Sequence, residues 1–326
     1  MSTPSPSTIP TGQLAGIEAQ AVEIVREAGR LLLARFRTTL KVDWKGKKEG
    51  VDPVTEADRE VEEFVRGELE RRFPDHGIAG EEGAGSGSEA RPYTWVLDPL
   101  DGTVNFMNGL PLWACSLGLI ENGVPVVGAI LIPWPRDGGV LVASAYKGGG
   151  ARLDGEEIRL PSEERSPARI AVMPFGAFRL RRQAPSQEGR PVERRSVGSI
   201  AYELAATAMG IYRYVIFTGP RTWDVAAGIV IVQEAGGKVY TMDSGARWRP
   251  FERFSAQPDA QGKPAAYPGQ EDLRRRIPPV LAGPALDVED AVQELVLAPS
   301  LLSRLLRTAR RALMGAGRGR PPPQAS

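Results

Sequence analysis

The chain of 326 residues is long enough for one large or two ordinary domains, and 42% hydrophobic with 25% charged residues is an ordinary globular composition. That composition excludes a chain disordered throughout, and the single cysteine, Cys115, excludes an internal disulfide framework. We therefore expect a reducing compartment, the cytoplasm by default. The formal charge of +1 conceals an asymmetry, because residues 299–326 carry six arginines and no acid.

The first half of the chain alternates helical patterns with short apolar runs. Residues 1–13 lack the basic and apolar regions of a secretory signal and are expected to form a disordered leader. Apolar spacing predicts a helix over 17–36, and a second over 56–73 begins behind the capping residue Thr55. After a charged loop and a Gly/Ser loop, short apolar runs predict strands at about 93–97, 113–120, 124–132 and 139–145.

The second half is also mixed in its patterns. An arginine-rich polar loop is followed by a predicted helix, strand, helix and strand, at 199–209, 212–217, 223–234 and 238–241. A surface excursion rich in Pro, Arg and Gln is expected over 246–278, before a last strand at 280–282 and helix at 288–297. The expected fold class is therefore α/β, with helices and sheets in layers.

The chain ends in a basic tail, residues 299–326. Leucines and alanines on one helical face predict an amphipathic helix over 300–313, followed by an unstructured end. Such a helix suggests an alternative function of another class, docking on an anionic membrane, a nucleic acid or a partner protein. No stretch reaches the roughly 20 apolar residues of a membrane helix, so no integral membrane segment is expected.

The stretch LDPLDGTVNF, residues 97–106, brings two acids to the end of an apolar run. Pro99 and Gly102 shape a turn in which the carboxylates of Asp98 and Asp101 and the Leu100 carbonyl can converge. Hard cations such as Mg²⁺ prefer these oxygen ligands, and the N–H groups after Gly102 suit a phosphate. A plain Asx-type turn that closes a strand explains the same residues.

Two more acidic stretches strengthen the metal hypothesis. GIAGEEG, residues 77–83, ends an apolar run in Glu81 and Glu82, and TWDVAAG, residues 222–228, places Asp224 at a helix start. Each also has an ordinary explanation, a solvated loop for the glutamates and a favourable first-turn charge for Asp224.

Taken together, four stretches resemble the inositol monophosphatase family of Mg²⁺-dependent, lithium-sensitive phosphatases. They are VDPVTEAD (51–58), GEE (80–82), LDPLDGTVNF (97–106) and WDVAAG (223–228). The resemblance implies a layered αβαβα sandwich over 14–298, in two closely packed halves of about 14–165 and 166–298. It also implies two or three Mg²⁺ ions, a small phosphate ester as substrate, and a homodimer.

The resemblance implies a ligand set for two of the metal ions. Glu81, Asp98 and the carbonyl of Leu100 would bind one ion. Asp98, Asp101 and Asp224 would bind the second.

It also implies the groups that act on water and phosphate. The hydroxyl of Thr103, oriented by Asp58, would hold the attacking water together with Glu81. The amides of Gly102 and Thr103 would contact the phosphate. No histidine is required, and His76 is expected to have only a local role in a loop or cap.

Substrate choice is less settled by the resemblance. Inositol-specific members carry a glutamate seven residues before the motif aspartate, where this chain has Phe217, which cannot accept hydrogen bonds from a sugar. Gly198 and Ser199 match the stretch that lines the polyol pocket, although Ser199 is equally suited to start a helix. Fructose 1,6-bisphosphate, 3′-phosphoadenosine 5′-phosphate and histidinol phosphate therefore stand as alternative substrates. Arginines at 179–182 or 194–195 would either hold a second phosphate or lie in a solvated loop.

Overall fold

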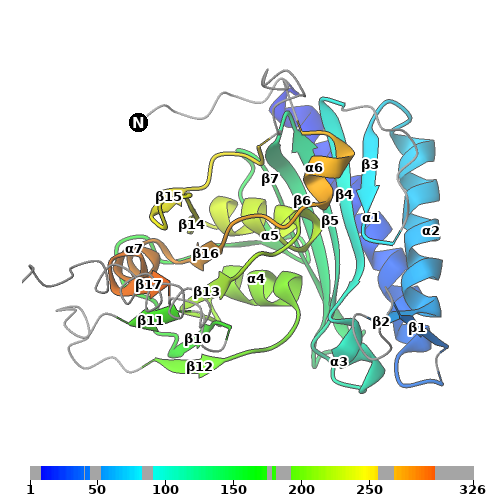
Figure 1. Cartoon of the computed structure of the whole chain (residues 1–326). Coiled ribbons are helices and arrows are strands. Elements are labelled where there is room, and N and C mark those ends of the chain that lie inside the picture. The colour runs from blue at the N-terminus through cyan, green and yellow to red at the C-terminus, as the bar shows by residue number, and fades with distance from the viewer. Residues whose placement is uncertain are drawn as a thin grey trace, which may run out of the picture.

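A computed structural model describes residues 9–39, 41–44, 53–82, 91–174, 178–180, 192–255 and 268–297, in which helices and sheets alternate in five layers (Figure 1). Two helices cover the outer face of a seven-stranded sheet, two lie between this sheet and a six-stranded one, and one covers the far face of the second sheet. In that order they are α1 (Thr11–Arg35), α2 (Glu56–Arg72), α4 (Ile200–Ala208), α5 (Thr222–Glu234) and α7 (Ala285–Glu294). This arrangement confirms the predicted αβαβα sandwich.

The seven-stranded sheet follows the chain order from β3 to β9. Its strands are β3 (Gly77–Gly80), β4 (Tyr93–Asp101), β5 (Ala114–Glu121), β6 (Val124–Pro133), β7 (Val140–Tyr146), β8 (Ala151–Leu153) and β9 (Glu156–Ile158). Only β3 and β4 pair in parallel; the other neighbours are antiparallel, and the segment that joins β4 to β5 contains the short helix α3 (Thr103–Met107). Between β5 and β6, Asn122 and Gly123 take φ values of 50° and 87°, as a tight hairpin turn requires.

The six-stranded sheet has the order β12-β10-β13-β16-β14-β15. Its strands are, in chain order, β10 (Ile170–Val172), β12 (Glu193–Arg195), β13 (Tyr214–Phe217), β14 (Lys238–Met242), β15 (Trp248–Pro250) and β16 (Val280–Gly283). Two small pairs, β1 (Val42–Trp44) with β2 (Pro53–Thr55) and β11 (Phe178–Leu180) with β17 (Leu295–Leu297), lie outside both sheets.

Close packing of α5 against the first sheet sets the position of this helix. The sheet offers Gly128 on β6, where a Cβ atom would lie 2.5 Å from the carbonyl oxygen of Ala227. Alternate residues of β4 face opposite layers: Trp95 and Leu97 pack with α1 and α2, and Val96 packs on the side of α4 and α5. The first turn of α5 is thereby held close to the end of β4.

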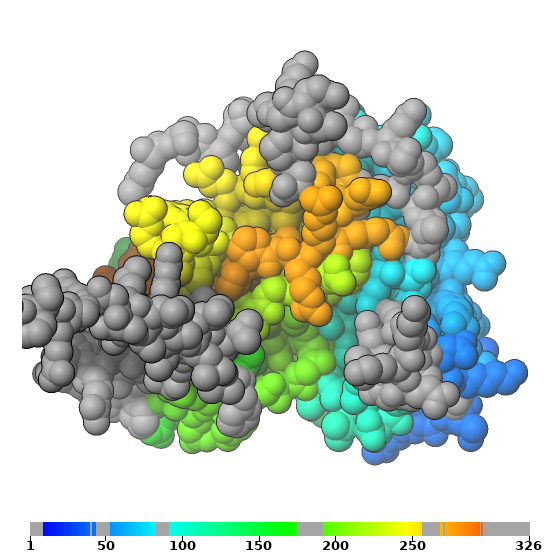
Figure 2. Space-filling view, in the orientation of Figure 1, coloured from blue at the N-terminus to red at the C-terminus, as the bar shows by residue number. Residues whose placement is uncertain are grey.

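The short helix α6 (Gln270–Arg274) packs against both β3 and α5. In the space-filling view its segment, in orange, forms a strip on the surface between the part of the chain that carries β14 and β15 and the part that carries β3 (Figure 2). The loop after β3 and the start of α5 therefore share a neighbour that is distant from both in sequence.

Several predicted boundaries differ from the structure. The helix α1 begins at Thr11, so the last residues of the expected leader are helical. The predicted last helix ends at Glu294, because residues 295–297 pair with β11 instead. The tail 299–326, the Gly/Ser loop 83–88 and the arginines at 181–182 lie outside the described residues. Within the described part, no helix is long and apolar enough to cross a membrane.

Candidate active site

The two aspartates of LDPLDG lie on one strand, which continues past Leu97 to Asp101. Asp98 pairs with Ser116 on β5 and Asp101 pairs with Ala114, so β4 holds one extra residue between them. The Leu100 N–H donates to Asp98 Oδ1 at 3.1 Å, which is the Asx-type contact that the sequence also suggested. The turn and the pair of acids are thus one feature.

The start of α4 holds Asp101 in place. Its Oδ2 accepts hydrogen bonds from the Ala201 N–H at 2.5 Å and the Ser199 hydroxyl at 2.9 Å. Ser199 also caps α4 by accepting from the Tyr202 N–H at 3.3 Å, as its helix-start interpretation predicted. Gly198 precedes it with φ of 92°. Ser199 therefore supports Asp101, and contact of Gly198 and Ser199 with substrate stays a prediction.

Asp224 and Glu81 approach the same place from other elements. Asp224, in the first turn of α5, accepts a hydrogen bond from the Arg221 N–H at 2.7 Å. Glu81 follows β3, and its N–H donates to the Leu97 carbonyl at 3.2 Å, which fixes it beside β4. The four acids therefore come from three parts of the chain: the end of β3, the end of β4 and the start of α5.

Burial and mutual repulsion disfavour ionisation of these acids. The pKa of Asp98 is raised well above its ordinary value by burial and by Glu81, Asp101 and Asp224. Burial raises the pKa of Asp224 well above its ordinary value and that of Asp101 to about 7, with neighbouring carboxylates adding to both shifts. A bound cation removes this repulsion, and an all-oxygen donor set fits Mg²⁺. Among the residues that the structure describes, no three His, Cys, Asp or Glu side chains are arranged closely enough to hold a metal ion as they stand.

A second group surrounds the start of α3 (Thr103–Met107). The Thr103 hydroxyl lies 3.2 Å from Asp58 Oδ1 and 3.0 Å from the Leu100 carbonyl. Asp58 is buried and its other oxygen accepts from the N–H and hydroxyl of Thr55, the predicted cap of α2. Gly102 has φ of 92°, and a Cβ atom there would lie 2.9 Å from the Leu112 carbonyl. The predicted link from Asp58 to Thr103 is therefore present.

Sequence reasoning missed Glu62, which supports the loop that carries Glu81. Glu62 is buried on α2, four residues after Asp58, and its Oε2 accepts from the Glu82 N–H at 2.7 Å. Its Oε1 accepts from Arg66 at 2.9 Å. Its position four residues after Asp58, on the same face of the predicted helix, was the feature of the sequence that could have indicated Glu62. An acid on a buried face needs a partner, because buried charges are costly when unpaired.

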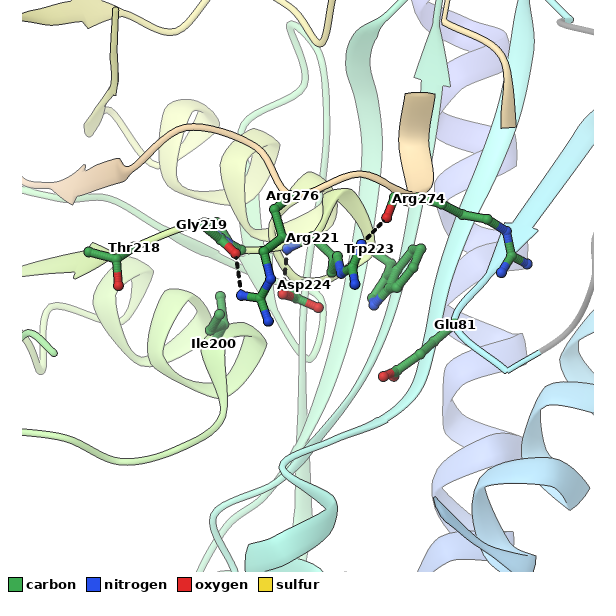
Figure 3. A pocket seen from close by; sticks show the side chains of 10 residues that line it. Glu81, Ile200, Thr218, Gly219, Arg221, Trp223, Asp224, Arg274 and Arg276 are labelled. Atoms are coloured by element: carbon green, nitrogen blue, oxygen red, sulfur yellow. Dashed lines mark hydrogen bonds between the residues drawn. The ribbon is translucent and has the colours of Figure 1, made fainter. Parts of the chain in front are cut away.

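The acids border a cavity of about 430 Å³ (Figure 3). Glu81 and Asp224 line one part of it, and arginines line another. The full lining comprises Glu81, Ile200, Thr218, Gly219, Pro220, Arg221, Trp223, Asp224, Arg274 and Arg276. Phe217 is absent from this lining, because its side chain is 5% exposed and packs in the core between the sheets.

The remaining candidate residues have structural roles. Cys115 is buried on β5, and burial raises the pKa of its thiol to about 12, which is unsuited to a nucleophile. The ring of His76 stacks on Phe73 with centroids 5.2 Å apart and contacts Tyr93 and Trp95. Neither side chain takes part in the acidic group.

Glu203 on α4 is expected to make the stability of the folded protein depend on pH. It accepts from the N–H groups of Val197 and Gly198 at 3.0 and 3.1 Å, and burial raises its pKa to about 8 from 4.5. The folded state therefore binds the proton more tightly, so stability is lost as pH rises from 4.5 through 8. We expect Glu203→Gln to gain about 1.4 kcal/mol per pH unit over wild type within this window.

Urea unfolding of both proteins at pH 5 to 9 in EDTA measures this difference. The variant keeps the accepting oxygen, and titrations of the other acids occur in both proteins. A difference that stays constant across the range would contradict the assignment.

Comparison with known proteins agrees with the layered fold. The profile of the inositol monophosphatase family matches residues 13–270. Inositol monophosphatase 3 of Solanum lycopersicum is 34% identical over 233 residues, covering 68% of this chain and 84% of that protein. The fructose-1,6-bisphosphatase/inositol-1-monophosphatase of Thermotoga maritima is 34% identical over 224 residues, covering 67% and 82%.

A solved structure of the extragenic suppressor protein suhB from Bartonella henselae superposes with a TM-score of 0.62 at 26% identity, covering 84% of this chain and 96% of that one. Fold and family together define the class of protein as a phosphoric monoester hydrolase. The chain belongs to the inositol monophosphatase family.

Proposed function

We propose that this site hydrolyses a small phosphate monoester with Mg²⁺, the substrate being inositol monophosphate or a related phosphorylated metabolite. One observation carries the proposal: Glu81 and Asp224 line one cavity, the buried Asp98 and the half-buried Asp101 interact with them electrostatically, and the pKa values of the three aspartates are raised. Such a group is unfavourable by itself and favourable around divalent cations.

The ligand roles follow from the resemblance to the family. Glu81, Asp98 and the Leu100 carbonyl would hold one Mg²⁺, and Asp98, Asp101 and Asp224 a second. When bound, such ions polarise a phosphoryl oxygen and lower the pKa of water. The hydrogen bonds from α4 to Asp101 keep that carboxylate aimed at the site.

The chain's other groups position water and phosphate. Asp58, which Thr55 fixes in place, accepts a hydrogen bond from the Thr103 hydroxyl. The oxygen of Thr103 can then accept a hydrogen bond from a water that Glu81 would also contact. The N–H groups of Gly102 and Thr103 would donate to phosphate oxygens at the start of α3. Proton transfer then uses carboxylate and hydroxyl groups, without a histidine.

The substrate within this class is tested by a panel of esters. Phe217 supplies no hydrogen bond to an inositol ring, which supports keeping the alternatives open. We expect Mg²⁺-dependent phosphate release from at least one of myo-inositol 1-phosphate, fructose 1,6-bisphosphate, 3′-phosphoadenosine 5′-phosphate and histidinol phosphate. Absence of Mg²⁺-dependent release from all four would contradict the proposed function.

The resemblance supports two finer proposals, a homodimer and inhibition by lithium at a magnesium position. The single cysteine supports a third, a cytoplasmic location. Weak binding of the basic tail, 299–326, to an anionic surface is a proposal from the sequence alone.

A further inference from the structure

Asn105 on α3 joins the connection between β4 and β5 to the segment that follows β12 of the second sheet. Its side-chain amide donates to the Leu112 carbonyl at 2.7 Å and to the Val197 carbonyl at 3.0 Å. Leu112 precedes β5, whereas Val197 precedes α4 and is 92 residues from Asn105 in sequence. In Figure 1 the segment between β12 and α4 runs from the second sheet toward α3. The amide therefore holds together two backbone segments that are distant in sequence.

The segment that Asn105 contacts, residues 197–199, is held from two further directions. Its first two N–H groups donate to Glu203 on α4 at 3.0 and 3.1 Å. The hydroxyl of Ser199 donates to Asp101 Oδ2, at the end of β4, at 2.9 Å. Hydrogen bonds from α3, α4 and β4 thus meet on three consecutive residues, and a network whose members are all satisfied is rigid.

Two of these hydrogen bonds and two short stretches of chain form a closed ring. From Asp101 the chain runs through α3 to Asn105, whose amide bonds to the Val197 carbonyl. Two residues further on, the hydroxyl of Ser199 returns to Asp101. The ring is also tightly packed, since a Cβ atom at Gly198, where φ is 92°, would lie 3.3 Å from the Asn105 amide nitrogen. The position of the Asp101 carboxylate therefore depends on the amide of Asn105.

We propose that Asn105 is a positioning residue of this active site, whose amide fixes the Asp101 carboxylate and residues 197–199 before metal and substrate bind. This inference rests on the proposed function, because it takes Asp101 as a metal ligand and Gly198 and Ser199 as substrate contacts. Groups already held in their binding geometry lose less freedom when a ligand binds. Asn105 therefore contributes to the affinity for Mg²⁺ and substrate, and touches neither of them.

Two substitutions of Asn105 test the inference. Asn105→Asp keeps the size of the side chain but turns a carboxylate oxygen toward two carbonyl oxygens, and Asn105→Ala leaves both carbonyls without this donor. We expect each variant to raise KM for the ester that wild type hydrolyses fastest, and the Mg²⁺ concentration at half-saturation, by about tenfold. At saturating Mg²⁺, kcat should stay within about threefold of wild type.

Asn108→Asp and Asn108→Ala are the matched controls. Asn108 is exposed, directly follows α3, and its amide donates to the Val104 carbonyl of that helix at 2.7 Å. Both control variants should keep the wild-type KM and Mg²⁺ dependence. Calorimetric titration of Mg²⁺ without substrate measures the change in metal affinity independently of turnover.

Each result bears on the inference separately from the proposed function. Unchanged KM and Mg²⁺ half-saturation in the Asn105 variants, measured well below their Tm, would overturn it even if the Tm falls, as would a loss confined to kcat or equal shifts in the Asn108 variants. If wild type hydrolyses no ester, the proposed function fails, and amide hydrogen exchange without metal decides the inference. Exchange at Val197 and Gly198 that is at least about tenfold faster in Asn105→Ala, but not in Asn108→Ala, supports it, and equal exchange contradicts it.

Discussion

Replacing Asp98 with asparagine is expected to lower Mg²⁺-dependent phosphate release by about 10³-fold, the equivalent of about 4 kcal/mol of lost stabilisation. Asp98 is the carboxylate shared by both proposed metal positions, so its charge acts on two ions at once. The substitution keeps the size of the side chain and the oxygen that accepts from Leu100. Phosphate release across an Mg²⁺ titration measures the loss.

Loss of activity should not be accompanied by loss of stability. Because burial and neighbouring carboxylates raise the pKa of Asp98, the variant should unfold in EDTA at a temperature equal to or above that of wild type, increasingly so as pH rises. Asp290→Asn, on α7 beyond the second sheet, is the control for activity. Full activity of Asp98→Asn, or the same loss in the control, would contradict the metal assignment.

Replacing Asp287 with asparagine is expected to lower the free energy of unfolding by about 3–5 kcal/mol. Asp287 is fully buried on α7; its Oδ1 accepts from Arg213 at 2.7 Å and its Oδ2 from the Ser166 N–H at 2.7 Å. The amide leaves the guanidinium of Arg213 buried without its counter-charge and turns an NH₂ group toward another donor. The Tm should fall by about 2–4 °C for each kcal/mol lost.

Asp290→Asn is again the matched control, since Asp290 lies three residues further on the same helix. Its partner Arg165, at 2.8 Å, has a side chain that is 43% exposed, so its loss should cost below about 1 kcal/mol. Thermal unfolding of both variants measures the contrast. Similar Tm values for the two variants would show that the buried pair gives no special stabilisation.

The acidic part of the site was predictable because its chemistry is local in sequence. Asp98 and Asp101 lie beside the turn-forming residues Pro99 and Gly102, Asp224 lies in the first turn of a helix, and the link from Asp58 to Thr103 is fixed by a helix cap. The mixture of helices and strands followed from the hydrophobic patterns, and their layered arrangement from the resemblance to the family. The end of β4 was not predicted correctly, because the sequence does not show that the strand continues through an extra, unpaired residue between Asp98 and Asp101.

The arginines of the cavity lining, Arg221, Arg274 and Arg276, were not predictable as neighbours, because their positions depend on pairing between distant segments. Arg276 reaches the cavity only because its backbone pairs with that of Arg221, in a stretch that the sequence predicts as a surface excursion. Conversely, Phe217 matches a pocket position by spacing, yet its ring packs in the core and its neighbour Thr218 lines the cavity. Spacing along a strand does not tell which face a side chain takes when the pocket forms at the strand's end.

The extra residue in β4 limits which sequence changes this site can accept during evolution. Residues three apart on a regular strand point to opposite faces, so Asp98 and Asp101 meet only because the strand is irregular between them. Leu100 is proposed to enter the site through its main-chain carbonyl alone, so exchange of that side chain leaves the ligand in place. Loss of one residue between the aspartates would leave both on one face of a regular strand but remove the irregular turn that brings the Leu100 carbonyl between them, so a deletion should be excluded here where substitutions are accepted.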